Sequence, residues 1–328
     1  MIRDFILPMS NLQKIVIIGG ITCAGKTETS LKLAERSPFK FEIVNFDSLC
    51  FYKYFDIGTA KPYESAKKSV KHHLFDIKYP DEEYNAHSFA EDARHTINGI
   101  TKKGKIPLFV GGTALYMKSL IYGFSPIPEL SKSKYRQKTV ELIDKLGTAA
   151  VYEKLKEVDP AYAKKISPND KQRIARAYEV YEATGRPFSS YLSENPFGKP
   201  LYDYLYFILI PPKDYLASCI IKRTDAILKA GLIDEIKGII NKGCPEDSKP
   251  FKSIGYKEGI MYLNKEINTD EELFQRIAAA TRQYAKRQAT YFKKAENGII
   301  ITQTDIEERL EIMEKHLKIF LIKGVNHK

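Results

Sequence analysis

The chain has 328 residues, of which 43% are hydrophobic and 28% charged, and this balance excludes a disordered or fibrous protein. Lysine and arginine number 52 against 41 aspartate and glutamate residues, so the formal net charge is +11. Such an excess favours association with polyanions such as nucleic acids, although many basic proteins bind none.

The cysteines and the hydropathy pattern limit the cellular setting. Cys23, Cys50, Cys219 and Cys244 lie far apart, and no pair has the C-x-x-C spacing of a structural zinc site. Scattered thiols of this kind are typical of a reducing compartment, so we expect a cytoplasmic protein. No apolar run approaches the length of a membrane span, and we expect no membrane association.

The first strong pattern is a glycine-rich loop between a predicted strand at 14–19 and a predicted helix at 26–36. Its sequence, Gly20-Ile21-Thr22-Cys23-Ala24-Gly25-Lys26-Thr27, matches the phosphate-loop pattern G-x-x-x-x-G-K-[ST] in full. In such a loop, backbone N–H groups and a helix N-terminus surround a di- or triphosphate. The Lys26 ammonium reaches the outer phosphate, and the Thr27 hydroxyl is a candidate Mg²⁺ ligand.

Alternating strands and helices continue to residue 122. We predict strands at 41–46 and 106–110 and helices at 88–103 and 115–122. This alternation indicates a parallel sheet covered on both faces, with ligands beyond the carboxyl ends of its strands. The phosphate loop, Asp47-Ser48 and Gly111-Gly112-Thr113 should therefore meet at one edge. A carboxylate there either holds Mg²⁺ or acts as a general base; the alternative for Asp47 is a turn-forming cap.

The character of the chain changes after residue 126. Only helical patterns occur between 131 and 191, which indicates a helical insertion. A strand at 204–210 then returns the chain to the sheet, followed by helices at 213–242 and 270–294. The spacing of Leu310, Met313, Leu317 and Phe320 predicts a last amphipathic helix. We predict a P-loop NTPase-like α/β core at 1–125 and 201–300, an all-helical insertion at 126–200, and a C-terminal helix within 301–328.

Two basic stretches are candidate RNA contacts. Arg173 and Arg176 lie three residues apart at the start of a helix that Asn169 or Asp170 can cap, and Gln172 precedes them. Arg282 and Lys286 share a face of a helix with interleaved tyrosines. The alternative for both stretches is a solvated basic face. We interpret the polar loop 56–62 and the adjacent His72 and His73 as structural.

Taken together, these segments resemble the tRNA dimethylallyltransferase (tRNA isopentenyltransferase) family. The matching strings follow the family order between residues 14 and 294. They are the phosphate loop, Phe46-Asp47-Ser48, Asp56–Pro62, His72–Ile77, Val110–Thr113 with Leu115-Tyr116, Asp159-Pro160, Pro168–Arg176, Glu179–Tyr181, Gly231-Leu232, Ile254–Glu258 and Ala280–Gln288. Several of these strings are highly specific, such as D-I-G-T-A-K-P and A-T-R-Q-x-A-K-R-Q.

The resemblance implies transfer of a dimethylallyl group from dimethylallyl diphosphate to N6 of the adenosine beside the anticodon, at position 37, with Mg²⁺ assisting. It implies a phosphate loop that holds the isoprenoid diphosphate, with Asp47 as the general base. Thr22 and Thr113 would lie beside the diphosphate or the target base. The anticodon stem-loop of tRNA would contact segments 47–50 (Asp47, Ser48, Leu49, Cys50) and 172–176 (Gln172, Arg173, Ile174, Ala175, Arg176). Arg136 matches a basic family site more loosely, and we expect a monomer.

Several positions depart from the family pattern, among them Ile21, Ala24 and Ser167, and two of the departures remove a side chain with an expected role. Cys50 replaces a glutamine that can contact a base edge, and Cys219 replaces an arginine that helps to hold the diphosphate. Lys222 or Arg223 would then take over the diphosphate contact, and we favour Arg223. The alternatives are prenylation of free adenine nucleotides, a small-molecule kinase or NTPase with the same loop, and a tRNA-binding module without catalysis.

Overall fold

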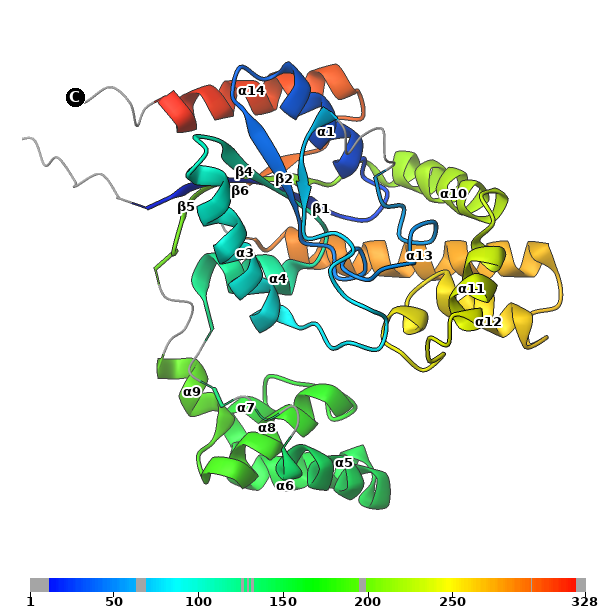
Figure 1. Cartoon of the computed structure of the whole chain (residues 1–328). Helices are drawn as coiled ribbons and strands as arrows, with labels where there is room; N and C mark the ends of the chain where they lie inside the picture. Colours follow the sequence, from blue (N-terminus) through cyan, green and yellow to red (C-terminus); the bar gives the residue numbers. More distant parts are fainter. Residues whose placement is uncertain are drawn as a thin grey trace, which may run out of the picture. The chain divides into compact units, whose positions relative to one another are not determined.

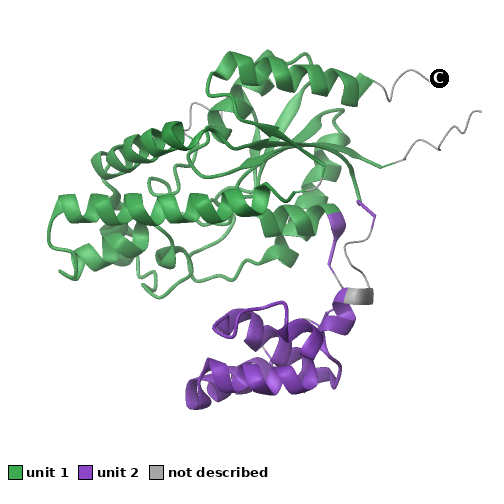
Figure 2. Cartoon of the chain, turned by 180° about the vertical axis from the view of Figure 1, so that it is seen from behind, with its two compact units in different colours: residues 1–121, 201–328 green, residues 122–200 purple. Residues whose placement is uncertain are grey.

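The computed structural model describes residues 12–62, 69–124, 127–128, 130, 133–194, 199–295 and 297–322. The chain divides into two compact units, residues 1–121 with 201–328 and residues 122–200, which we call unit 1 and unit 2 (Figure 2). Residues 126–200, predicted as a tRNA-contacting insertion, fall in unit 2, and that contact stays a prediction. Residues 301–328, predicted as a separate C-terminal element, belong to unit 1. In the part of the chain described, no helix is long and apolar enough to cross a membrane.

Unit 1 is built on a six-stranded sheet with the strand order β3-β2-β4-β1-β5-β6. Every pairing in it is parallel, which confirms the predicted class of sheet. The strands are β1 (Lys14–Gly20), β2 (Phe41–Asn45), β3 (His72–His73), β4 (Ile106–Val110), β5 (Asp203–Leu209) and β6 (Gly298–Ile301). β1, β2, β4 and β5 are apolar runs buried on both faces, as expected for a covered parallel sheet.

Helices cover both faces of this sheet (Figure 1). On one face lie α1 (Lys26–Arg36) and α14 (Ile306–Ile322), which pack against each other; α3 (Ala86–Thr101), α4 (Ala114–Tyr122) and α13 (Asp270–Phe292) cover the other. Within the described residues, the other helices of unit 1 are α10 (Lys213–Lys229), α11 (Leu232–Asn241), the 3₁₀ turn η1 (Pro250–Lys252) and α12 (Tyr256–Leu263). Leu310, Met313 and Leu317 are buried on α14, which confirms the predicted amphipathic helix.

Sequence patterns missed β3, β6 and α12. β3 has two residues and β6 only four, so neither is long enough to show the period of a strand. α12 begins in a glycine-containing stretch, at Tyr256, where the Glu258 carboxylate accepts a hydrogen bond from the Gly255 N–H. Pairing with a neighbouring strand defines β3 and β6, and a cap defines the start of α12. Neither leaves a periodic pattern in the sequence.

Helices are the regular elements in the described part of unit 2, as predicted. This part contains α5 (Lys134–Leu146), α6 (Thr148–Val158), α7 (Pro160–Ala163), α8 (Lys171–Thr184) and α9 (Phe188–Glu194). Its core includes Val151, Leu155, Ile174, Ala177 and Val180, all fully buried. The Asp170 side chain accepts a hydrogen bond from the Arg173 N–H and so caps α8, one of the two caps the sequence allowed.

A buried carboxylate links α5 to α8 within unit 2. Glu179 is almost fully buried, and its two oxygens pair with Arg136 at 3.1 Å and Arg176 at 2.5 Å. Arg176 also donates to the carbonyl of Pro128 at 2.8 Å. Removal of one carboxylate therefore leaves two cations without their partner, and burial makes such a loss costly.

We expect Glu179→Ala to lower the free energy of unfolding of unit 2 by about 1–3 kcal/mol, because it breaks a buried charge-assisted pair. Hydrogen exchange of the α8 amides in the full chain measures this loss. Glu153→Ala removes an exposed pair with Lys156 and should cost less than about 0.5 kcal/mol. Equal exchange rates in the two variants would contradict the stabilising role of the ion pairs of Glu179.

Candidate active site

The glycine-rich loop leaves β1 at Gly20 and enters α1 at Lys26, as its pattern predicted. Gly20 has φ 134°, and a Cβ there would lie 2.4 Å from the Leu209 carbonyl oxygen, so only glycine fits against β5. The N–H groups of Cys23, Ala24 and Gly25 have no hydrogen-bond acceptor within the described residues. They are free to bind an anion at the N-terminus of α1.

Lys26 lies in this loop with its ammonium 2.8 Å from the carbonyl oxygen of Ile21 and 3.2 Å from that of Gly20. Burial lowers the pKa of Lys26 to about 8. The Asp47 carboxylate opposes this lowering, and the Arg223 guanidinium adds to it. A phosphate anion beside the ammonium would raise this pKa again, because an opposite charge favours the protonated form.

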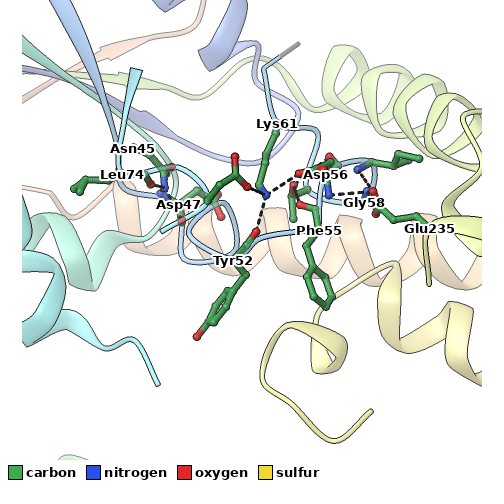
Figure 3. A network of polar contacts seen from close by, with 12 residues as sticks. Asn45, Asp47, Tyr52, Phe55, Asp56, Gly58, Lys61, Leu74 and Glu235 are labelled. Carbon is green, nitrogen blue, oxygen red and sulfur yellow. Dashed lines mark hydrogen bonds and ion pairs between the residues drawn. The ribbon is translucent and has the colours of Figure 1, made fainter. Parts of the chain in front are cut away.

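Asp47 follows the end of β2 and is held in a defined turn. Asn45 is buried; its side-chain oxygen accepts from the Asp47 N–H at 2.8 Å, and its amide nitrogen donates to the Leu74 carbonyl at 2.9 Å (Figure 3). Asp47 Oδ1 accepts from the Leu49 N–H at 3.1 Å. Its Oδ2 has no hydrogen bond to the described chain, so one carboxylate oxygen remains available to a ligand. Next in the chain, the Ser48 N–H donates to the Thr113 hydroxyl at 3.0 Å.

Loop 56–62 is held by a polar network that sequence patterns did not reveal (Figure 3). The Lys61 ammonium, almost fully buried, donates to Asp56, Asp76 and the carbonyl of Tyr52. From α11, the Glu235 carboxylate accepts from the N–H groups of Asp56 and Ile57 at 3.1 and 2.8 Å. The predicted structural role of this loop is correct, but the network also brings Gly58 and Thr59 to the site.

Two cavities open where these segments meet. The first, which we call the phosphate cavity, has a volume of about 390 Å³ and is lined by residues 22–27 of the glycine-rich loop together with Asn45, Cys50, Cys219 and Gln288. The second has a volume of about 310 Å³ and is lined by Ser48, Leu49, Gly58, Lys252, Thr281 and Arg287, among others. The two cavities share Thr22, Asp47, Thr59, Arg223 and Tyr284.

Helix α13 supplies residues that sequence reasoning overlooked. Tyr284 lines both cavities, and Gln288 joins two of the loops. The Gln288 side chain accepts from the Thr22 N–H at 2.8 Å and donates to the Gly112 carbonyl at 3.1 Å. Thr281, Tyr284 and Gln288 recur at three- and four-residue spacing, a polar stripe visible in the sequence beside the charges that drew attention instead.

On α10, Arg223 lines both cavities, whereas the exposed Lys222 lines neither. Arg223 is held by long hydrogen bonds to the carbonyls of Gly58 and Thr59, at 3.4 and 3.3 Å. Of the two residues that the sequence offered in place of an arginine at Cys219, Arg223 is thus at the site. Cys50 is buried, and burial raises the pKa of its thiol, so this side chain is a neutral part of the wall.

Two of the predicted tRNA contacts need correction. Ile174 and Ala175 lie in the core of unit 2, so their side chains cannot contact RNA; the apolar face of α8 is needed for packing. Arg136 and Arg176 are partly exposed and pair with Glu179, and their RNA contacts stay predictions. Thr113 lines neither cavity but accepts a hydrogen bond in the loop after Asp47, and its place beside the diphosphate or the target base stays a prediction. Gln172, Arg173, Arg282 and Lys286 are exposed, and their RNA contacts stay predictions.

Comparisons with known proteins all indicate one family. The family model described as IPP transferase matches residues 50–295. A tRNA dimethylallyltransferase 2 of Geotalea uraniireducens is 42% identical over 281 residues, 86% of this chain and 89% of that protein. The tRNA dimethylallyltransferase of Caldanaerobacter subterraneus is 40% identical over 282 residues, 85% of this chain and 89% of that protein.

Solved structures agree with the sequence relatives. The full-length tRNA isopentenylpyrophosphate transferase of Bacillus halodurans matches with a TM-score of 0.69 and 32% identity, covering 95% of this chain and 97% of that one. A eukaryotic dimethylallyltransferase acting on tRNA matches with a TM-score of 0.81 and 27% identity, covering 96% of this chain and 80% of that one.

The state of Lys26 predicts how anion binding depends on pH. Without a ligand, the pKa of Lys26 is about 8, and an anion beside the ammonium raises it. Above pH 8, anion binding is therefore accompanied by uptake of a proton. Affinity for inorganic diphosphate should be full below pH 8 and fall above it, by up to about tenfold per pH unit. Calorimetric titration from pH 7 to 10, in buffers of different ionisation enthalpy, measures both the affinity and the proton uptake.

The control is Lys26→Arg, whose guanidinium stays charged over this range. Titration of the diphosphate itself is common to both proteins and cancels in the comparison. The same pH slope in both proteins would show that Lys26 does not titrate as inferred.

Proposed function

The chain belongs to the IPP transferase family, and on that basis we propose that it transfers a dimethylallyl group from dimethylallyl diphosphate to N6 of the adenosine at position 37 of tRNA. The observation that carries the mechanism is the position of Asp47, which lines both the phosphate cavity and the second cavity. A group in the wall of both can contact an acceptor base in one while the diphosphate lies in the other.

The phosphate cavity suits an isoprenoid diphosphate. Free N–H groups, Lys26 and Arg223 surround the place of the anion, and the apolar side chains of Ile43, Phe75 and Val110 line the same cavity. Donors fixed in advance stabilise the negative charge that builds on the leaving diphosphate. The apolar wall offers the dimethylallyl group a place out of water.

In the reaction, the N6 lone pair of adenine forms a bond to C1 of the dimethylallyl group as the C1–O bond to the diphosphate breaks. The N6 proton passes to Asp47 Oδ2, and diphosphate leaves. An exocyclic amine is a weak nucleophile because its lone pair is delocalised into the ring, so removal of its proton by a placed base assists attack. The adenosine must leave its stack to enter the second cavity.

We propose Mg²⁺ as the cofactor, held by Thr27 and the diphosphate. Thr27 is exposed at the phosphate cavity, and its hydroxyl makes no hydrogen bond within the described chain. Among the described residues no cluster of three His, Cys, Asp or Glu side chains forms a metal site. A single hydroxyl together with the oxygens of the diphosphate fits Mg²⁺, which keeps most of its waters and binds through one or two protein ligands and phosphate oxygens. When bound, the ion neutralises charge on the leaving group.

The RNA surface in unit 1 includes the outer face of α13. Arg282 and Lys286 are exposed one turn apart, and neither has an ion pair within the described residues, whereas Arg287 and Lys252 line the second cavity. Unpaired cations beside the entrance for a base suit the phosphates that flank it. For unit 2 we propose the exposed Gln172 and Arg173 of α8, of which Arg173 pairs with Asp170 at 2.6 Å.

We expect Asp47→Asn to slow single-turnover prenyl transfer by about 10²–10⁴-fold, because asparagine keeps the hydrogen bond from Leu49 but cannot take a proton. Affinity for tRNA should change less than about threefold, within the range of a substitution that leaves the surface charge pattern intact. Asp234→Asn, an exposed change on α11, is the matched control and should leave the rate unaltered. A near-normal rate for Asp47→Asn would refute the base assignment.

We expect the double variant Arg282→Gln and Lys286→Gln to weaken tRNA binding and to reduce the salt dependence of log Kd by about two units of slope, one for each lost phosphate contact. Filter binding between 50 and 300 mM salt measures the slope. Arg276→Gln, on the same helix but paired with Glu272, should leave it unchanged. A slope that stays at the wild-type value in the double variant would remove these residues from the RNA surface.

A further inference from the structure

A buried arginine lies behind the glycine-rich loop, on the side away from the phosphate cavity. Arg309 belongs to α14, far from the loop in sequence, and is 3% exposed. Its Nη1 donates to the Ala24 carbonyl at 3.0 Å, and its Nε donates to the Gln303 carbonyl at 2.7 Å. A Cβ added to Gly25 would lie 2.8 Å from Nη1, so the guanidinium is in close contact with the loop backbone.

The guanidinium has only neutral acceptors. Besides the two carbonyls, it approaches the Thr29 hydroxyl at 3.4 Å, and no carboxylate of the described chain pairs with it. A buried cation without a counter-charge is costly, and an anion close to the guanidinium would offset that cost. The nearest place for an anion is the loop itself, whose N–H groups are free on the opposite side.

The hydrogen bond from Arg309 acts through a single peptide group. The Ala24 carbonyl that accepts it belongs to the same peptide as the Gly25 N–H, one of the free donors of the loop. A charged donor at the oxygen polarises that peptide and makes its N–H a stronger donor. Thr29 adds to the arrangement, because its hydroxyl donates to the Gly25 carbonyl at 2.8 Å.

We propose that Arg309 is a positioning residue for the diphosphate: it fixes and polarises the Ala24–Gly25 peptide so that the loop binds the anion, and its buried charge balances that anion from behind. This inference rests on the proposed function only for the identity of the diphosphate as a leaving group. α14, which the sequence presents as an ordinary amphipathic helix, thereby becomes part of the site.

The test is the affinity of the full chain for inorganic diphosphate, measured by calorimetry, together with the KM values for dimethylallyl diphosphate and for tRNA. Arg309→Gln should weaken diphosphate binding by about ten- to hundredfold, the range for a lost charged hydrogen bond. It should raise KM for dimethylallyl diphosphate and leave KM for tRNA unchanged. Arg309→Lys keeps the charge, but its donors sit on a single nitrogen and cannot reproduce the contacts that Nε and Nη1 make, so it should fall between Arg309→Gln and wild type.

The matched control is Arg36→Gln. Arg36 is a half-exposed arginine of α1 that pairs with Glu307 and Glu314 of the same α14, so its loss weakens the contact between these helices without touching the loop. It should bind diphosphate as wild type does. Equal losses in Arg36→Gln and Arg309→Gln would overturn the inference, because helix docking alone would then explain both.

Two further comparisons distinguish a loss of folding from a loss of diphosphate binding, and this inference from the proposed function. If Arg309→Gln does not fold, Arg309→Lys must still bind diphosphate more weakly than Arg36→Gln at equal melting temperature, and equal affinity would overturn the inference. A wild-type chain that shows the expected diphosphate pattern but no prenyl transfer to tRNA would overturn the proposed function and support the role of Arg309.

Discussion

The parallel pairing of β1 with β4 on one side and β5 on the other is the constraint on which the site depends. In that register Ile18 pairs with Val110 and with Phe207, so the loops after β1 and β4 leave the sheet at the same edge. β2 pairs with β4 through Asn45 and Val110, which places Asp47 at that edge as well. The pairing also requires glycine at position 20, because any side chain there would meet the backbone of β5.

Around this edge, buried polar groups are satisfied by residues distant in sequence. Gln288 of α13 joins the glycine-rich loop to the loop after β4, and Glu235 of α11 holds loop 56–62. Each bond is made by a side chain with little freedom to move, because its own helix is packed against the core. The carboxylate, the free N–H groups and the cations therefore keep their positions without a ligand, as electrostatic stabilisation of a leaving group requires.

The cations of the site differ in environment, and this difference divides their roles. Lys26 is desolvated in the loop, so its charge responds to an approaching phosphate. Arg223 lines both cavities, with its guanidinium hydrogen-bonded to the carbonyls of Gly58 and Thr59. Arg309 is sealed behind the loop and acts through the peptide of Ala24. On the surface, Arg282 and Lys286 are exposed and have no ion pair within the described residues, which suits contact with RNA phosphates.

The sequence by itself determined the glycine-rich loop, the parallel α/β class, the helical unit and Asp47 as the candidate base, because these depend on local periodicity and on short motifs with a fixed geometry. It also predicted side-chain contacts for Ile174 and Ala175 that packing excludes, since spacing on α8 does not say which face is buried. Only the tertiary structure decided that Gln288, Tyr284 and Arg309 belong to the site. The loop groups that Gln288 and Arg309 contact lie more than 170 residues away in the chain, and no local pattern records which distant backbone group a buried side chain will meet.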